Sequence, residues 1–123
     1  MKVSRTLHSQ TIRRVAIAAA TYVIQGVQLD AGDELTIQTI GYTNETSNNK
    51  DMTWGFRIGS RDVWVHTIQG AGNGLFHSWV GPVTIPSQCR LLFKVLSPAA
   101  GNKTTINVVG YIETVCPETD PAT

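Results

Sequence analysis

The chain has 123 residues, a length that fits one domain with a core large enough to need no metal or disulfide staple. Charged residues make up only 15% of the chain, against roughly 25% in an ordinary soluble domain, so uncharged polar residues must cover most of the surface. The formal net charge of +1 excludes a general attraction to nucleic acid or anionic membranes, which only the basic first residues could provide.

The charges are unevenly distributed along the chain. Residues 15–112 hold six bases and six acids, so the central body is neutral. Residues 1–14 hold four bases and no acid, whereas residues 113–123 hold three acids and no base. Oppositely charged ends on a neutral body indicate ends that contact a neighbouring molecule. Residues 116–123 are therefore expected to form an acidic tail that complements the first segment of another subunit.

Residues 1–14 are predicted to form an extended, basic N-terminal arm. Four charges are few for an arm that binds phosphate backbones at physiological salt, so nucleic acid is not the expected partner. Apolar residues between the bases could anchor an extended segment on a neighbour or at the edge of its sheet. The arm residues expected to contact the partner are Lys2, Arg5, Leu7, Ile12, Arg13 and Arg14.

Residues 15–24 follow Arg13 and Arg14 and are rich in Ala, Val and Ile, which imitates a secretory signal sequence. We expect neither a signal sequence nor a membrane span, because Thr21 and Tyr22 interrupt the apolar residues and the stretch is too short to cross a bilayer. The stretch is expected instead to lead into a strand.

From here to residue 115 the sequence predicts one strand after another. Between Met52 and Ile58 large apolar residues occupy every second position, so one face of this strand belongs to the core. Residues 62–68 form an adjacent run that a tight turn at Ser60 and Arg61 would pair with it as a hairpin. The other expected strands are residues 21–28, 34–43, 75–80, 90–96 and 104–115.

Turn-forming residues separate these runs. Gly, Asn, Asp and Pro tolerate turn geometry, and they cluster at residues 30–33, 43–51, 70–74, 81–82, 86–87 and 97–103. No segment of ten or more residues combines a 3.6-residue period with helix caps. About seven or eight short strands with such joints predict an all-β sandwich or barrel.

The order of the later strands resembles a known group of folds. Residues 83–86 lead into residues 89–95, and a final apolar run covers residues 106–112, as in the closing strands of small viral jelly-roll modules. This group includes the capsid decoration (cement) proteins and the head-fibre or tail-tip domains of tailed bacteriophages. The resemblance covers about residues 20–115 and contains no diagnostic motif. It implies a single-domain, jelly-roll-like β-sandwich over residues 15–115.

No pattern of residues predicts a catalytic or metal site. His8, His66 and His77 lack zinc-ligand spacing, and ordinary strand residues are the preferred interpretation over a site made by His66, His77 and Cys89. No G-x-S-x-G elbow is present. We therefore expect no enzyme activity, no cofactor and no metal.

The acids lie mostly in turns, loops and the tail, where they serve solubility and turn formation. Asp30, Asp33 and Glu34 could gather oxygen ligands around calcium, but the rest of a calcium loop is missing. Cys89 and Cys116 are too few for a disulfide framework and are expected to be free thiols, although the sequence leaves their pairing open.

The three tryptophans are expected to have different roles. Trp54 shares the apolar face of its strand with Met52 and belongs to the core. Trp64 has the parity of Ile68, so both faces of that strand are apolar, and one of them is expected to meet a subunit. Trp79, beside a Gly-Pro turn, is the best candidate for exposure. Trp64 and Trp79 complete the expected partner contacts.

The function predicted from these observations is that of a non-enzymatic structural virion protein. More specifically, we expect a capsid decoration or cement protein, assembled in the host cytoplasm, that forms a dimer or trimer on the capsid surface and stabilises the shell by repeated contacts. An alternative is a carbohydrate- or receptor-binding module of a fibre or tail tip, presenting Trp79 and the loops at residues 43–51 and 70–74. A third is a capsid subunit whose basic arm contacts packaged nucleic acid.

Overall fold

The computed structural model describes residues 2–17, 19–44, 51–68, 76–96 and 100–116. These residues form eight β-strands and, within the described ranges, no helix. In that part of the chain, accordingly, no helix is long and apolar enough to span a membrane. The strands are β1 (Lys2–Val15), β2 (Tyr22–Gln28), β3 (Asp33–Asn44), β4 (Met52–Ile58), β5 (Arg61–Ile68), β6 (Phe76–Ile85), β7 (Arg90–Val95) and β8 (Lys103–Cys116).

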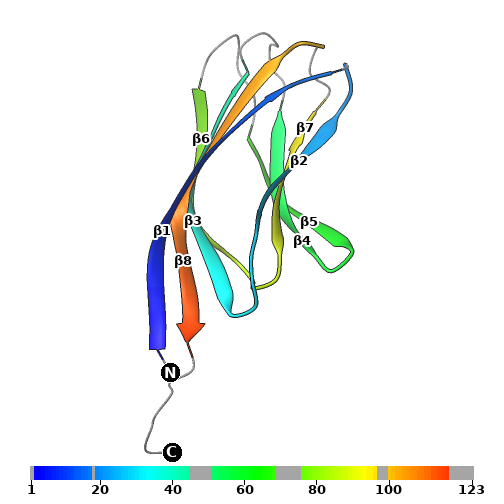
Figure 1. Cartoon of the computed structure of the whole chain (residues 1–123). Helices are drawn as coiled ribbons and strands as arrows, with labels where there is room; N and C mark the ends of the chain where they lie inside the picture. Colours follow the sequence, from blue (N-terminus) through cyan, green and yellow to red (C-terminus); the bar gives the residue numbers. More distant parts are fainter. Residues whose placement is uncertain (1, 18, 45–50, 69–75, 97–99, 117–123) are drawn as a thin grey trace, which may run out of the picture.

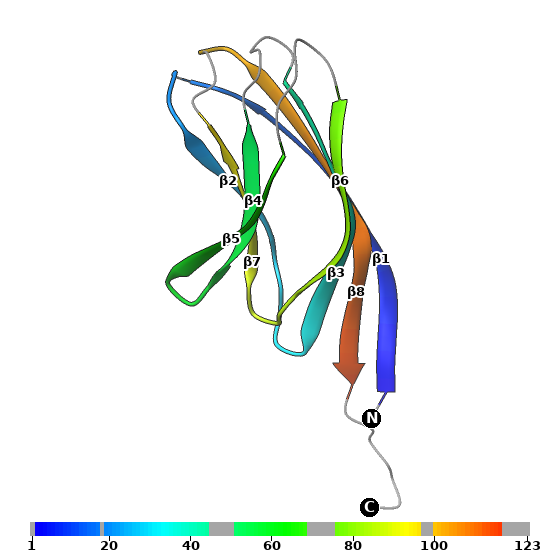
Figure 2. The same ribbon diagram turned by 180° about the vertical axis from the view of Figure 1, so that it is seen from behind.

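The strands build two four-stranded sheets that pack face to face (Figure 1). Sheet A has the order β1-β8-β3-β6, and sheet B has the order β2-β7-β4-β5. The strands pair in order from the two ends of the sequence towards its middle: β1 with β8, β2 with β7, β3 with β6 and β4 with β5. Successive pairs alternate between the sheets, which is the jelly-roll arrangement that the sequence predicted. Figure 2 shows from behind that β1 and β8 extend past sheet B at the end where the chain begins.

The hydrophobic core lies between the two sheets. Every second residue of a strand points inwards, and the apolar residues at these positions are buried, as predicted for β4, in which Trp54 is completely buried. Burying a Leu, Ile or Phe side chain contributes about 1.5–3 kcal/mol relative to leaving it exposed. The largest fully buried side chains include Trp54, Tyr42, Phe93, Leu35, Ile37, Ile40, Ile85 and Leu91.

The predicted turn at Gly81 and Pro82 lies inside β6, which is longer than expected. Two features let a proline occupy this strand. β6 is at the edge of sheet A, so it needs ladder hydrogen bonds on one side only. Pro82 also lies where the register of the β3–β6 pair shifts, between Ile37 and Thr39 of β3. The strand therefore continues past a residue that normally ends one.

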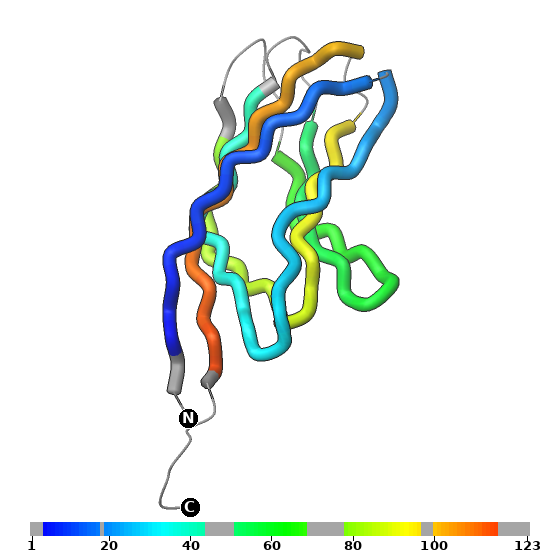
Figure 3. Tube along the Cα trace, viewed as in Figure 1, coloured from blue at the N-terminus to red at the C-terminus, as the bar shows by residue number. Residues whose placement is uncertain are grey.

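Residues 1–14, predicted to extend away from the body as an arm, are instead its edge strand from residue 2 onwards. β1 pairs with β8 over its whole length, from Lys2 opposite Cys116 to Val15 opposite Lys103. Figure 3 shows the two strands side by side. The basic segment and the acidic end do attract each other, because Arg5 forms a salt bridge with Glu113, but both belong to one chain. Residues 117–123 of the predicted tail lie outside the described residues.

Candidate functional site at the end of β1

One side of the sandwich presents two open strand edges. β1 is an edge of sheet A and β2 is an edge of sheet B, and the short connection after residue 15 joins them on the same side. Within the described residues no strand pairs with the outer edge of β1. Residues 6–12 of β1 contain no Lys, Arg, Asp or Glu, the charged residues with which proteins often block such an edge. We call β1, β2 and their connection the β1 side.

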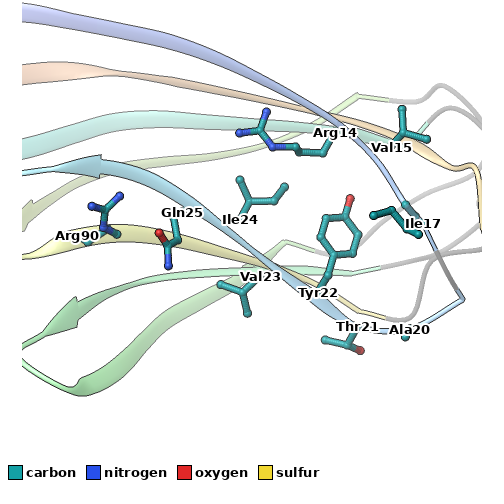
Figure 4. A pocket seen from close by; sticks show the side chains of 11 residues that line it. Arg14, Val15, Ile17, Ala20, Thr21, Tyr22, Val23, Ile24, Gln25 and Arg90 are labelled. Carbon is teal, nitrogen blue, oxygen red and sulfur yellow. The ribbon is translucent and has the colours of Figure 1, made fainter.

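An open groove of 580 Å³ runs along the β1 side. Figure 4 shows the Arg14 guanidinium, Ile24 and the Tyr22 ring in the space between β1 and β2. The rim is apolar and accessible, since Ile17 is 97% exposed and Val15 is 58% exposed. The other lining residues are Ala16, Ala20, Thr21, Val23, Gln25 and Arg90.

Three bases gather where β1 ends and β8 begins. We call Arg13, Arg14 and Lys103 the basic corner. A second hollow of 320 Å³ lies between them and is also lined by Val15, Thr104 and Thr105. The Arg14 side chain donates a hydrogen bond to the carbonyl of Arg13 at 2.8 Å.

The basic corner has no carboxylate partner among the described residues. Their ion pairs join Arg5 to Glu113 and Arg57 to Asp62 instead. Guanidinium and ammonium groups bind carboxylates and phosphates by charge-assisted hydrogen bonds. The corner therefore combines free positive charge with the exposed apolar rim of the groove.

The structure separates the six residues predicted to form the arm contact. Arg13 and Arg14 are exposed in the basic corner, and Leu7 is 75% exposed on the outer face of sheet A. Arg5 already contacts Glu113 at 2.8 Å, and its guanidinium carbon lies 4.3 Å from the centroid of the Tyr111 ring. The side chain of Lys2 lies outside the described residues.

Ile12 is the arm residue whose predicted role the structure corrects. It is only 5% exposed and packs in the core, because it lies on the inward face of β1. An extended arm would have left this side chain free to contact a neighbour. In an edge strand the same alternation turns it towards the second sheet.

The predicted exposure of Trp79 is also wrong. Its ring centroid lies 4.8 Å from that of Trp54 in an edge-to-face contact, and the ring packs against the core. Trp79 is paired with the buried Ile40 of β3, so it shares the inward face of sheet A. The ring is therefore not a free platform for a sugar.

Trp64 faces outwards from sheet B, but not for the predicted reason. The register of the β4–β5 pair shifts so that His66 pairs with Trp54, Trp64 pairs with Gly55, and Val65 has no partner residue. This bulge breaks the parity between Trp64 and Ile68, and Ile68 is in the core. The Lys94 ammonium lies 4.4 Å from the centroid of the Trp64 ring. Half-buried Trp64 is thus covered in part by its own chain.

Other accessible apolar residues were not predicted. Ile17 and Val23 line the groove, and Val80 and Val109 are exposed on the outer face of sheet A. Lys103 was not predicted either, although it begins the last strand. No local pattern marks these positions, because the groove exists only once β1 and β2 are placed at neighbouring edges.

Among the described residues, no three His, Cys, Asp or Glu side chains gather in a way that could hold a metal ion. Cys89 is a free, buried thiol, and burial raises its pKa, so little of the reactive thiolate forms at neutral pH. The side chains of Cys116 and His77 lie outside the described residues.

The sequence matches no family model and no curated protein. Solved structures are similar to it. A Bacillus endospore appendage protein, described as forming disulfide-linked pili, has a TM-score of 0.57 at 16% identity, with 94% of this chain and 91% of that chain covered. The Drosophila NLP core has a TM-score of 0.49 at 15% identity, covering 86% of this chain and 96% of that one.

The tobacco streak virus coat protein has a TM-score of 0.43 at 12% identity, covering 92% and 91% of the two chains. At these identities the similarity to the appendage protein shows the fold alone. The chain is an all-β, jelly-roll-like sandwich.

Proposed function

We propose that this chain is a non-enzymatic structural protein of a virion, which assembles through the β1 side of its sandwich. The observation that carries the proposal is the composition of that side. An open edge strand, an accessible apolar groove and three bases without described partners lie together on a sandwich with few charges elsewhere. Exposed edges and apolar patches of this kind are typical of protein contacts. The resemblance of the later strands to viral jelly-roll modules supports the virion as the location of the protein.

Within this class we infer a decoration or cement protein on the capsid surface, acting as a dimer or trimer. A small, neutral sandwich offers a limited contact area to each neighbour. An oligomer that touches several shell subunits at once turns weak single contacts into strong overall binding. The stabilisation of the shell would come from this avidity, and assembly would take place in the host cytoplasm.

The similarity to the Bacillus appendage protein supports assembly as the role of the fold. That protein is described as forming disulfide-linked pili, so a sandwich of similar fold is found there in an assembled structure. The carbohydrate-binding alternative loses its main residue, because Trp79 packs on Trp54. Most of the two loops that this alternative needs lies outside the described residues.

Reconstitution on virus particles tests the proposed function. Quantitative mass spectrometry of purified particles should find the chain in a fixed ratio to the shell protein, and antibody labelling should place it on the exterior. Particles stripped of the chain should bind the purified protein back to the same ratio. Ile17→Asp should lose this binding, because a charge on the groove rim opposes burial of that surface.

Val65→Asp is the matched control, because Val65 is also exposed but lies on β5, at the opposite edge of sheet B. This variant should bind like the wild type. Absence of the chain from particles, or a ratio that varies between preparations, would show that the proposed function is wrong.

A further inference from the structure

The basic corner has no acidic partner among the described residues of its own chain. Arg13, Arg14 and Lys103 line one hollow, and Arg14 also lines the apolar groove, so charge and apolar surface adjoin. We infer that the occupant is the acidic segment around Glu118 and Asp120 of a second copy, and that copies associate head to tail. The inference rests on the proposed function, for which it names the partner and the contact.

The length of β8 keeps this segment away from the basic corner of its own chain. The basic corner lies at Lys103, and Cys116 lies at the opposite end of the strand, beside Lys2. At about 3.3 Å per residue the strand separates these ends by about 40 Å. Glu118 and Asp120 follow Cys116 by two and four residues, so even a fully extended chain carries them only about 7 and 14 Å. The corner of another copy is the one within reach.

The sequence of the acidic segment favours the shape that an open edge can accept. Pro117 and Pro121 flank it, and a proline disfavours helical conformation at the residue before it, here Cys116 and Asp120. In an extended segment, residues two positions apart point to the same side. Bound in extended form along a strand edge of a second copy, the segment would bring Glu118 and Asp120 to the same side.

Sheet A has the matching polarity at its two ends. Arg13 and Lys103 lie at one end. Asp33, Glu34 and Glu113 lie near the end that leads to the acidic segment, where the register also places Lys2 and Arg5. Arg5 neutralises Glu113, and Glu34 has no ion-pair partner among the described residues. Contact between the basic corner of one copy and the acidic segment of another is reciprocal in a two-fold dimer, and it is heterologous in a closed ring such as a trimer.

Charge reversal with complementation tests the inference on the full-length protein. Sedimentation velocity at low salt measures the association of three proteins: the wild type, E118K/D120K and R13E/R14E. Each variant should associate at least about tenfold more weakly than the wild type, because like charges then meet at the contact. An equimolar mixture of the two variants should recover association, because each lysine tail then meets a glutamate corner.

Arg61→Glu is the matched control, because Arg61 is an exposed base at the start of β5 with no described partner. It should associate like the wild type. If R13E/R14E does not fold, as judged by circular dichroism, Lys103→Glu takes its place in the mixture.

Three results would overturn the inference. Variants that associate as strongly as the wild type would leave assembly intact and show that another surface mediates it. A mixture that fails to recover association would show that corner and tail do not contact each other. A wild type that remains monomeric at every concentration would count against the proposed function as well.

Discussion

At the scale of single residues, two glycines allow their strands to approach the backbone of a paired strand closely, beside a register shift in that strand. A Cβ atom on Gly110 of β8 would lie 2.1 Å from the carbonyl oxygen of Thr36, next to the register shift in β3. A Cβ atom on Gly55 of β4 would lie 2.0 Å from the carbonyl oxygen of Val63, next to the bulge in β5. Because the obstructing atoms belong to the backbone, a side chain at either position forces the strands apart.

Gly110→Ala should therefore destabilise the fold by about 1–3 kcal/mol, the usual cost of overpacking. Chemical denaturation followed by circular dichroism measures the free energy of unfolding. Ser9→Ala, at an exposed position of β1, is the control and should stay within about 0.5 kcal/mol of the wild type. An alanine variant as stable as the wild type would contradict the close approach of the strands at this glycine.

The same bulges explain for which residues the sequence predicts the correct face of the strand, and for which it does not. The alternation around Trp54 predicted a core position, and the structure confirms it. Counting residues assigned Trp64 and Ile68 to the same face of β5. The unpaired Val65 between them is an extra residue, so Trp64 and Ile68 face opposite sides. A bulge depends on the partner strand, and its position is not visible in the residues of the bulged strand alone. The exposure of Trp79 was wrong because its contact with Trp54 joins residues from different sheets.

At the scale of elements, the β4–β5 hairpin carries an ion pair between Arg57 and Asp62, and the protonation of the Asp62 carboxyl can be measured. Arg57 donates a hydrogen bond to Asp62 at 2.7 Å, and this bond is the main cause that lowers the pKa of Asp62. The contribution of the pair is present above the pKa that Asp62 has in the unfolded chain. It is lost as the pH falls through the lowered pKa of the folded protein.

Arg57→Gln should raise the pKa of Asp62, as followed by the carboxyl carbon shift in an NMR titration. Arg61→Gln, a base of the same hairpin without a described partner, should leave that pKa where it is in the wild type. An unchanged Asp62 pKa in the Arg57 variant would show that the two side chains do not pair in solution.

The first strand is the element whose removal has the largest predicted effect. Deleting residues 2–15 removes Ile12 from the core and exposes the paired edge of β8. The truncated chain should be unfolded or far less stable, as measured by denaturation and by the dispersion of its amide NMR spectrum. Removing residues 118–123 is the control, because these residues follow the last described strand. A truncated chain lacking β1 with wild-type stability would contradict the pairing of β1 with β8.

The assignment of residues 1–14 to an arm shows where sequence reasoning ends. Its bases and scattered apolar residues fit an arm on a neighbour as well as they fit an edge strand. The deciding partner is β8, and the contact of Arg5 with Glu113 spans 108 positions. Such long-range pairing leaves no local pattern. The strands of the body were largely predictable because alternation and turn residues are local signals, although the turn expected at Gly81 and Pro82 lies inside β6.

At the scale of the whole molecule, the fold places two open edges on one side. The jelly-roll winding brings β1 and β2 to neighbouring edges, so the groove and the basic corner follow from topology. The rest of the surface carries few charges and suits packing against other proteins. We therefore propose the β1 side as the surface for assembly.

Hydrogen exchange of the assembled protein tests this claim most directly. Exchange rates are compared between the assembled protein and the same protein dissociated at high salt, with peptide-level mass spectrometry. The account predicts slower exchange in residues 6–17 of the assembled form, where the open edge of β1, the basic corner and the groove rim lie. Unchanged exchange in these residues, with new protection confined to β5 and β6 at the opposite side, would contradict it.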